Sequence, residues 1–227
     1  MTARFAKPRV VLTDIEGTKT PISFVKDVLF TFARARIADY VRAHGDDPAV
    51  AQIVNEAGAG DPERAIAQLH AWSDADMKIG PLKSLQGLIW EDGYRAGLLK
   101  APVFPDAAAA LRDWHAAGIT LAVYSSGSVL AQKRLFTSSD QGDLAILFSG
   151  FFDTAMGAKR EATAYARIAA ALSMAPAEIL FMSDIPEELD AAHAAGLRTL
   201  HVVRPGEGSA ATRRHPHIAS FAEIDWD

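Results

Sequence analysis

The chain has 227 residues, of which 49% are hydrophobic and 22% are charged, and its formal net charge is -5. This composition is typical of a folded globular protein and excludes a disordered chain. The negative charge argues against general nucleic-acid binding, which needs basic side chains, and the absence of cysteine excludes disulfides and thiolate metal sites.

The sequence also lacks the features of a membrane or exported protein. No apolar stretch approaches the roughly 18 residues of a membrane span, and residues 1–8 lead into the first strand without a signal-type apolar region. We therefore expect a cytoplasmic protein with no membrane partner. Nothing in the sequence demands more than one chain, so we expect a monomer.

The first predicted element is a short apolar strand that begins at Val10 and runs into Asp14 and Glu16, followed by Gly17 and Thr18. Residues past the C-terminal end of a buried parallel strand face the crevice where α/β sheets bind ligands. Asp14 suits nucleophilic attack on phosphorus and Glu16 suits proton transfer to the leaving group, which requires different protonation states. An ordinary turn with Glu16 at the surface is the alternative. Thr18 either holds the turn or binds a phosphoryl oxygen.

Residues 22–100 are predicted to be helical, with no convincing strand. The predicted helices are 24–43, 48–57, 62–73 and 82–95. Pro48 and Pro62 stand where helices begin, and Asp47 and Asp61 precede them as N-caps. This block is predicted to be a helical cap.

From residue 103 onward, predicted helices and strands alternate. The helices are 106–117, 129–137, 160–172 and 187–195, and the strands are 119–124, 148–152, 179–183 and 198–203. Such alternation predicts an α/β fold with a Rossmann-like parallel sheet, covered by helices on both faces. The first strand belongs to the same sheet. Residues 1–20 and 101–227 are therefore expected to form the catalytic core, and residues 21–100 an inserted helical cap.

Polar residues follow two later strands of this sheet. Ser125 and Ser126 precede a predicted helix, where hydroxyls and free backbone N–H groups make an anion site; capping of that helix by Ser126 or Ser128 is the alternative. Lys159 is predicted to open a helix, where a cation opposes the helix dipole and a bound anion would offset the cost. A solvated surface lysine is the alternative there.

Asp184 ends the strand 179–183, and Glu188 follows one helical turn later. Asp184 either reaches a divalent cation shared with Asp14, with Glu188 completing the acidic shell, or precedes an ordinary capped helix. A carboxylate about 4 Å from a phosphate is repelled by roughly 4 kcal/mol per unit charge at an effective dielectric near 20. Attack by Asp14 therefore needs counter-charge, which Mg²⁺ and Lys159 would supply.

The sequence thus has four candidate sites at successive strand ends: Asp14 with Glu16, Ser125 with Ser126, Lys159, and Asp184. In this order they resemble the four motifs of the haloacid dehalogenase superfamily of aspartate-nucleophile phosphatases. Glu16 narrows the resemblance to the enolase-phosphatase family of methionine salvage, in which glutamate replaces the usual second aspartate of the first motif. Similar stretches cover nearly the whole chain: residues 20–30, 82–94, 124–129 and 202–206. Lys19 departs from the family, which usually has threonine there.

The resemblance implies a haloacid dehalogenase-like fold, one Mg²⁺ per chain, and action on 2,3-diketo-5-methylthiopentyl 1-phosphate. This small-molecule substrate would be enolised and then dephosphorylated to an acireductone. Asp14 would be the nucleophile and a metal ligand, Glu16 the acid/base residue that also binds the metal through its backbone carbonyl, and Asp184 the third ligand. Substrate phosphate would be held by Ser125, Ser126 and Lys159.

Three other functions remain as alternatives. A related capped phosphatase acting on another small phosphate ester would keep the four motifs but not the stretch from Leu85 to Trp90. A metal-free dehalogenase has no need of Glu16. A binding protein on the same scaffold would be expected to have lost Asp14 or Lys159.

Overall fold

The computed structural model describes residues 3–227 and divides them into two compact units. The first unit consists of residues 3–22 and 101–227, and the second consists of residues 23–100. Over the described range, no helix has both the length and the apolar character needed to cross a membrane.

The first unit is built on a six-stranded parallel sheet with the strand order β4-β3-β2-β5-β6-β7. Its strands are β2 (Val10–Thr13), β3 (Thr120–Tyr124), β4 (Phe148–Phe152), β5 (Ile179–Ser183), β6 (Arg198–Val202) and β7 (His217–Ile218). Every residue of the central strands β2 and β5 is buried, because both faces of a parallel sheet are covered. The predicted α/β fold with a parallel sheet is confirmed.

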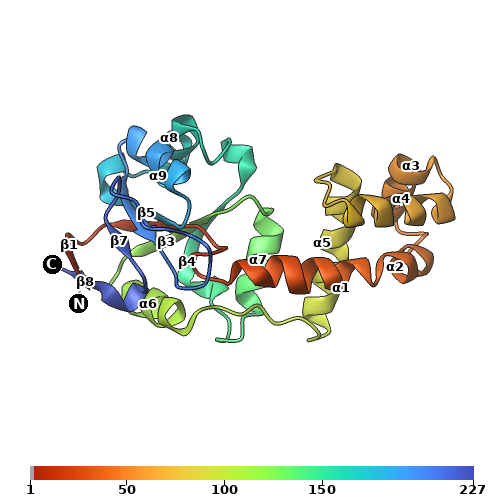
Figure 1. Ribbon diagram of the computed structural model, residues 1–227, viewed down its shortest axis with the longest axis horizontal. Helices are drawn as coiled ribbons and strands as arrows, with labels where there is room; N and C mark the ends of the chain where they lie inside the picture. The colour runs from red at the N-terminus through yellow and green to blue at the C-terminus, as the bar shows by residue number, and fades with distance from the viewer. Residues whose placement is uncertain (1–2) are drawn as a thin grey trace. The chain divides into compact units, whose positions relative to one another are not determined.

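Helices cover this sheet on both faces. Figure 1 shows α8 (Ala162–Ala171) and α9 (Pro186–Ala194) on one side of the sheet and α6 (Pro105–Ala116) on the other. The remaining helix, α7 (Val129–Thr137), packs beside β4. Short helical turns complete the connections: η2 (Ala145–Leu147), η3 (Thr154–Met156), η4 (Pro176–Glu178) and η5 (Phe221–Glu223).

The register of the sheet brings three strand ends to one edge. Thr13, the last residue of β2, pairs with Val123 of β3 on one side and with Met182 of β5 on the other. The residues that follow these three strands therefore leave the sheet side by side. This is the carboxyl edge, at which open α/β sheets bind their ligands.

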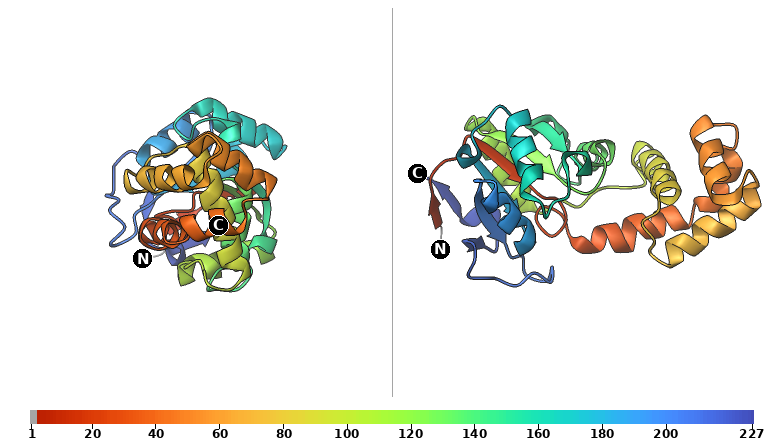
Figure 2. Two further views of the ribbon diagram at one scale, coloured as in Figure 1. Left: turned by 90° about the vertical axis from the view of Figure 1, so that its right-hand side faces the viewer. Right: turned by 90° about the horizontal axis from the view of Figure 1, so that it is seen from above.

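The second unit contains helices joined by turns (Figure 2). They are η1 (Phe24–Phe30), α1 (Thr31–Arg34), α2 (Ile37–Ala43), α3 (Pro48–Gly58), α4 (Pro62–Asp74) and α5 (Gly80–Arg95). The predicted N-caps are confirmed: the Asp47 carboxylate accepts the Ala49 N–H, and the Asp61 carboxylate accepts the N–H groups of Glu63 and Arg64.

The prediction of one continuous helix over residues 24–43 is wrong. The segment begins as the π-helix η1 and breaks between α1 and α2 at Arg36. The Arg36 N–H donates to the Ala33 carbonyl, three residues back. In a regular α-helix it would donate to the Phe32 carbonyl, four residues back. Here the Arg36 guanidinium donates to that carbonyl instead, at 3.1 Å. The side chain thus replaces a backbone hydrogen bond of the helix.

Three short strands were not predicted: β1 (Ala3–Phe5), β7 and β8 (Ile224–Trp226). Segments of two or three residues carry no periodic signal. β1 and β8 pair in parallel as a separate two-stranded sheet, seen in Figure 2 as neighbouring red and dark blue strands. Trp226 anchors this pair by packing on Trp114 of α6, with ring centres 5.4 Å apart.

Arg204, which is 6% exposed, joins three parts of the first unit. Its guanidinium donates to both carboxylate oxygens of Asp106 (3.0 and 3.1 Å) and to the Thr18 carbonyl (2.7 Å). Asp106 also accepts the Ser220 hydroxyl (2.7 Å) and the Phe221 N–H (2.8 Å). The start of α6, the loop after β2 and the segment before β8 are therefore tied together.

Replacing Asp106 with alanine is expected to lower the free energy of unfolding by about 3 kcal/mol, because the buried Arg204 guanidinium loses its counter-charge. Burial alone would raise the pKa of Asp106, but the Ser220 hydrogen bond and the Arg204 charge outweigh it and lower that pKa. The stabilisation by the ionised Asp106 carboxylate is complete above the ordinary pKa of a carboxyl group. It is lost as the pH falls through the lowered pKa that Asp106 has in the folded chain.

Urea unfolding at neutral and acidic pH tests this prediction. Asp113→Ala is the control, because Asp113 is exposed on the same helix and its loss should cost no more than about 0.5 kcal/mol. Equal unfolding free energies of the two variants would contradict the role assigned to Asp106.

Candidate functional site

A hollow of about 220 Å³ lies within the first unit at the carboxyl edge of the sheet. Its walls are formed by Asp14, Glu16, Ile22, Ser125, Ser126, Lys159, Asp184, Ile185 and Glu188. All six residues predicted from the sequence as site residues are in this set. The structure therefore brings them together from four separate stretches of the chain.

Lys159 lies at the centre of the charged groups. Its ammonium is 2.7 Å from Asp14 Oδ1 and 2.7 Å from Glu188 Oε2, and its side chain is 11% exposed. Glu188 also accepts the Ser183 hydroxyl at 3.0 Å. Burial alone would lower the pKa of Lys159, but the charges of Asp14 and Glu188 outweigh it and raise that pKa, so the side chain is a cation.

Lys159 is not in a helix, which corrects the expectation that it opens one. α8 begins at Ala162, and Lys159 lies three residues earlier in the loop after η3. Its carbonyl accepts the Tyr165 hydroxyl instead of a helical N–H. The helix dipole is therefore not what this lysine opposes; two carboxylates offset its charge directly.

The loop after β2 is shaped around Asp184. Gly17 has φ +66°, and a Cβ built on it would lie 2.4 Å from Asp184 Oδ2, so only glycine fits there. Thr18 is fully buried and its hydroxyl donates to Asp184 Oδ1 at 3.4 Å. Of the two roles left open for Thr18, the structure thus shows the one that holds the loop. Asp14 Oδ1 accepts the Ile15 N–H at 2.7 Å, which orients the carboxylate.

The serines after β3 divide between capping and the hollow. Ser128 is the N-cap of α7, and its hydroxyl accepts the Ala131 N–H at 3.3 Å. Ser125 is buried and Ser126 is exposed, and both line the hollow. Ser125 Oγ accepts the Gly127 N–H at 3.3 Å, but a hydroxyl oxygen that accepts can still donate its O–H. With Ser128 as the cap, both Ser125 and Ser126 can therefore donate to an anion.

Two carboxyl groups of the hollow, those of Asp184 and Glu188, are disfavoured in their ionised form. Burial raises the pKa of Asp184 to about 7, and the charge of Asp14 adds to that rise. The same two causes, in the same order, raise the pKa of Glu188 to about 7. Carboxyl groups whose pKa values are raised in this way indicate a place where a bound cation would be stabilised.

The oxygen donors suit Mg²⁺ in particular. Across residues 3–227, no group of three or more histidine, aspartate or glutamate side chains is arranged to hold a metal. A cation here would depend on the carboxylates of Asp14 and Asp184, a backbone carbonyl such as that of Glu16, and oxygens of substrate and water. Mg²⁺ accepts such a set, because it commonly binds through one or two carboxylates and retains several waters.

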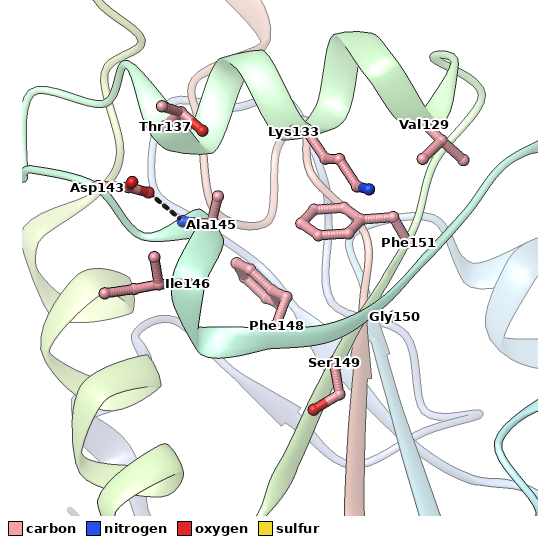
Figure 3. Close-up of a pocket in the computed structure, with 10 residues that line it drawn as sticks. All are labelled: Val129, Lys133, Thr137, Asp143, Ala145, Ile146, Phe148, Ser149, Gly150 and Phe151. Atoms are coloured by element: carbon pink, nitrogen blue, oxygen red, sulfur yellow. Dashed lines mark hydrogen bonds between the residues drawn. The ribbon is translucent and has the colours of Figure 1, made fainter.

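A larger hollow, of about 480 Å³, lies between α7 and β4 of the same unit. Figure 3 shows the rings of Phe148 and Phe151 in it, with Lys133 reaching in from α7. The Lys133 amine lies 5.7 Å from the centre of the Phe151 ring. None of the predicted site residues lines this hollow, so chemistry and not size identifies the site.

Lys19 does not add a cation to the site wall. Its side chain is fully buried, and its amine lies 4.5 Å from the centre of the Phe136 ring and 4.7 Å from that of Phe148. The amine has no hydrogen-bond partner among the described residues. Burial lowers the pKa of Lys19 well below its ordinary value, although the charge of Asp14 opposes this.

Replacing Lys19 with methionine is expected to raise the free energy of unfolding by about 2 kcal/mol at pH 7, because it removes a buried amine that no group satisfies. The unfolded chain binds a proton at Lys19 at pH values where the folded chain does not, so wild-type stability rises with pH up to the ordinary lysine pKa of about 10.4. The difference in free energy of unfolding between Lys19→Met and wild type should therefore shrink as the pH rises, by at most about 1.4 kcal/mol per pH unit.

Urea unfolding of wild type and Lys19→Met at pH 7 and pH 9 measures this. Lys133→Met is the control, because Lys133 is exposed yet also lies near a phenylalanine ring. A constant difference between wild type and Lys19→Met at the two pH values would refute the lowered pKa.

Two lining residues were not predicted. Ile22, which is 39% exposed, and Ile185 add apolar surface to the otherwise polar hollow. Each adjoins a motif that the sequence did indicate, since Ile185 follows Asp184 and Ile22 belongs to the stretch 20–30. Position next to a motif is the signal that would have identified them.

The chain is similar to known phosphatases over nearly its whole length. A family model of haloacid dehalogenase-like hydrolases matches residues 8–196. An enolase-phosphatase E1 from Granulibacter bethesdensis is 57% identical over 219 residues, which is 96% of this chain and 95% of the relative. One from Pseudomonas aeruginosa is 52% identical over 222 residues, which is 95% of this chain and 97% of the relative.

Solved structures are similar as well. The UTR4 protein of Saccharomyces cerevisiae has a TM-score of 0.83 and 35% sequence identity, covering 95% of this chain and 99% of that one. CbbY from Rhodobacter sphaeroides, solved in complex with phosphate, has a TM-score of 0.63 at 17% identity, covering 95% of this chain and 96% of that one. At this identity, the similarity to CbbY shows only that the two proteins share a fold.

Proposed function

The chain belongs to the enolase-phosphatases among the haloacid dehalogenase-like hydrolases, and from that membership we propose the reaction and the residues that perform it. The reaction converts 2,3-diketo-5-methylthiopentyl 1-phosphate into an acireductone and inorganic phosphate. Enolisation moves a proton from carbon to a carbonyl oxygen, and dephosphorylation follows. The proposal covers the substrate, the dependence on Mg²⁺ and the role of each site residue.

The observation that carries the proposal is the pairing of Asp14 with Lys159 inside one hollow. A carboxylate that attacks phosphorus needs a cation to hold the phosphoryl oxygens beside it, and the Lys159 ammonium lies 2.7 Å from Asp14 Oδ1. Ser125 and Ser126 border the same hollow and offer hydroxyls to the remaining phosphoryl oxygens. These groups match the needs of phosphoryl transfer.

Mg²⁺ would be held by the carboxylates of Asp14 and Asp184 and by the Glu16 backbone carbonyl. When bound, it would neutralise charge on the phosphoryl group as the group is transferred. The raised pKa values of Asp184 and Glu188 support this assignment, because burial first and the charge of Asp14 second disfavour their ionised forms, and a bound cation would offset both effects.

The side chains perform the phosphatase half as follows. The Asp14 carboxylate forms a bond to phosphorus while the bond from phosphorus to the ester oxygen breaks, and Glu16 donates its proton to the leaving oxygen. Water then attacks phosphorus and gives a proton to Glu16, which frees the Asp14 carboxylate and inorganic phosphate. Lys159 stabilises the phosphoryl oxygens in both steps.

The test is to supply the diketo phosphate with Mg²⁺ and to follow enol absorbance and free phosphate as separate signals. We expect both signals, a loss of phosphate release on chelation that Mg²⁺ restores, and a preference for this substrate over simple phosphate esters such as p-nitrophenyl phosphate. Equal rates with simple esters and no enol signal would instead favour a capped phosphatase that acts on another small ester.

A further inference from the structure

Two buried tyrosines hold the loop that carries Lys159. Tyr124, the last residue of β3, donates its hydroxyl to the Gly157 carbonyl at 2.9 Å. Tyr165, in α8, donates its hydroxyl to the Lys159 carbonyl at 2.7 Å. The backbone is therefore hydrogen-bonded on both sides of Ala158. Both tyrosine side chains have an exposed fraction of 0%.

The packing of the rings directs these hydroxyls. The Tyr124 and Tyr165 rings meet edge to face, with centres 5.5 Å apart and an interplanar angle of 84°. The ring of Tyr165 also packs on Phe181 of the central strand β5, at 5.0 Å. Rings held from several sides have one position available, so each hydroxyl reaches one carbonyl. Burial raises the pKa of Tyr124 to about 12, so its hydroxyl remains a hydrogen-bond donor at neutral pH.

The loop needs such support because no helix or strand includes it. Lys159 lies between η3 and α8, and Gly157 has φ +128°, a backbone conformation that L side chains rarely adopt. The Lys159 ammonium nevertheless lies only 2.7 Å from Asp14 Oδ1. An error of about 1 Å in placing a catalytic group can lower a rate about 10²-fold.

Tyr124 also connects two parts of the site. It directly precedes Ser125, and its ring lies 5.8 Å from the Lys159 ammonium. The end of β3 and the Lys159 loop are thus joined through one side chain. A displacement of either part would change the distance between the serine hydroxyls and the ammonium.

We propose that Tyr124 and Tyr165 are positioning residues for phosphoryl transfer, whose hydroxyls place the Lys159 ammonium by fixing the backbone on both sides of Ala158. This inference rests on the proposed role of Lys159 in holding phosphate.

The test uses Tyr124→Phe and Tyr165→Phe, which remove only the hydroxyls, each in the wild-type and the Lys159→Met backgrounds. The probe is inorganic phosphate with Mg²⁺, and its binding is measured by calorimetry, which requires no turnover. In the wild-type background each change is expected to weaken phosphate binding and to lower kcat roughly five- to tenfold, the effect of one lost hydrogen bond. In the Lys159→Met background the same changes should not weaken phosphate binding further.

Ser139→Ala is the matched control. Ser139 is a buried residue of the same unit whose hydroxyl donates to the Gly142 carbonyl at 2.6 Å, outside the hollow. The Ser139→Ala variant should bind phosphate and turn over substrate as the wild type does, even if the melting temperature of the variant is lower. This separates a general loss of stability from misplacement of Lys159.

Three results would overturn the inference, and they differ in what else they imply. Wild-type phosphate binding and kcat in both tyrosine variants would remove the positioning role alone. Equal weakening of phosphate binding in both backgrounds would show that the tyrosines do not act through Lys159. Wild-type phosphate binding and release in Lys159→Met itself would remove the proposed role of Lys159, and the inference with it.

Discussion

Replacing Asp14 with asparagine is expected to lower the rate of phosphate release by roughly 10⁴-fold or more. An amide does not attack phosphorus, so no aspartyl phosphate forms. Asp14 is well placed for that attack, because its carboxylate is buried, is oriented by the Ile15 N–H and lies beside the Lys159 ammonium. The substitution preserves the shape of the side chain, so the loss measures chemistry more than packing.

Phosphate release from the diketo phosphate should be measured beside enol absorbance, because only phosphoryl transfer needs the nucleophile. Asp113→Asn makes the same chemical change at an exposed position on α6 and should retain wild-type rates. Phosphate release at the wild-type rate from folded Asp14→Asn would show that another group attacks phosphorus.

Replacing Gly17 with alanine is expected to lower phosphate release roughly 10²-fold or more. The new Cβ would lie 2.4 Å from Asp184 Oδ2 and 2.6 Å from Asp184 Cγ, so the carboxylate must move away. Such a shift would disturb the proposed metal site and break the 3.4 Å hydrogen bond from Thr18. A displacement of about 1 Å is enough to cost about two orders of magnitude in rate.

The control for Gly17→Ala is Gly142→Ala. Gly142 also has a positive φ, +85°, but a Cβ there meets nothing within 4 Å. Both variants should lose about 1 kcal/mol of stability to backbone strain, while only Gly17→Ala loses activity and requires a higher Mg²⁺ concentration. If Gly17→Ala kept the wild-type rate and Mg²⁺ dependence, contact with Asp184 would not be the reason for this glycine.

Much of the fold followed from periodicity and turn residues. The strands 148–152 and 179–183 and the helix 129–137 were predicted with the bounds that the structure has. The strand 179–183 is buried throughout and is a nearly continuous apolar run, which stands out against the polar residues that end it. The short strands β7 and β8 gave no such signal, because their pairing depends on partners far away in the chain.

The site followed from one further step of reasoning. Asp14, Ser125 and Asp184 each come directly after a predicted strand, and parallel strands that share a sheet end at one edge. The sequence therefore predicts that these three residues meet. Lys159 was harder, since it does not come directly after the strand 148–152 that precedes it, and its predicted place in a helix was wrong.

Contacts between distant residues were beyond the sequence. Nothing local indicates that Lys159 lies between Asp14 and Glu188, or that the Lys19 side chain turns inward between two phenylalanine rings. Likewise, no pattern predicts that the Tyr124 hydroxyl reaches Gly157 across 33 positions of the chain. Such contacts depend on how elements pack, and packing is decided by the whole chain at once.

The α/β class, the strand ends and the residue types that gather there can be derived from the amino-acid sequence, because strands and turns have local signals and parallel strands share an edge. Which groups touch depends on the folded chain: Gly17 lies against Asp184, Lys159 lies between two carboxylates, and Lys19 points away from the hollow. Distance and burial set the charge state and position of each group, and both arise from segments far apart in the chain.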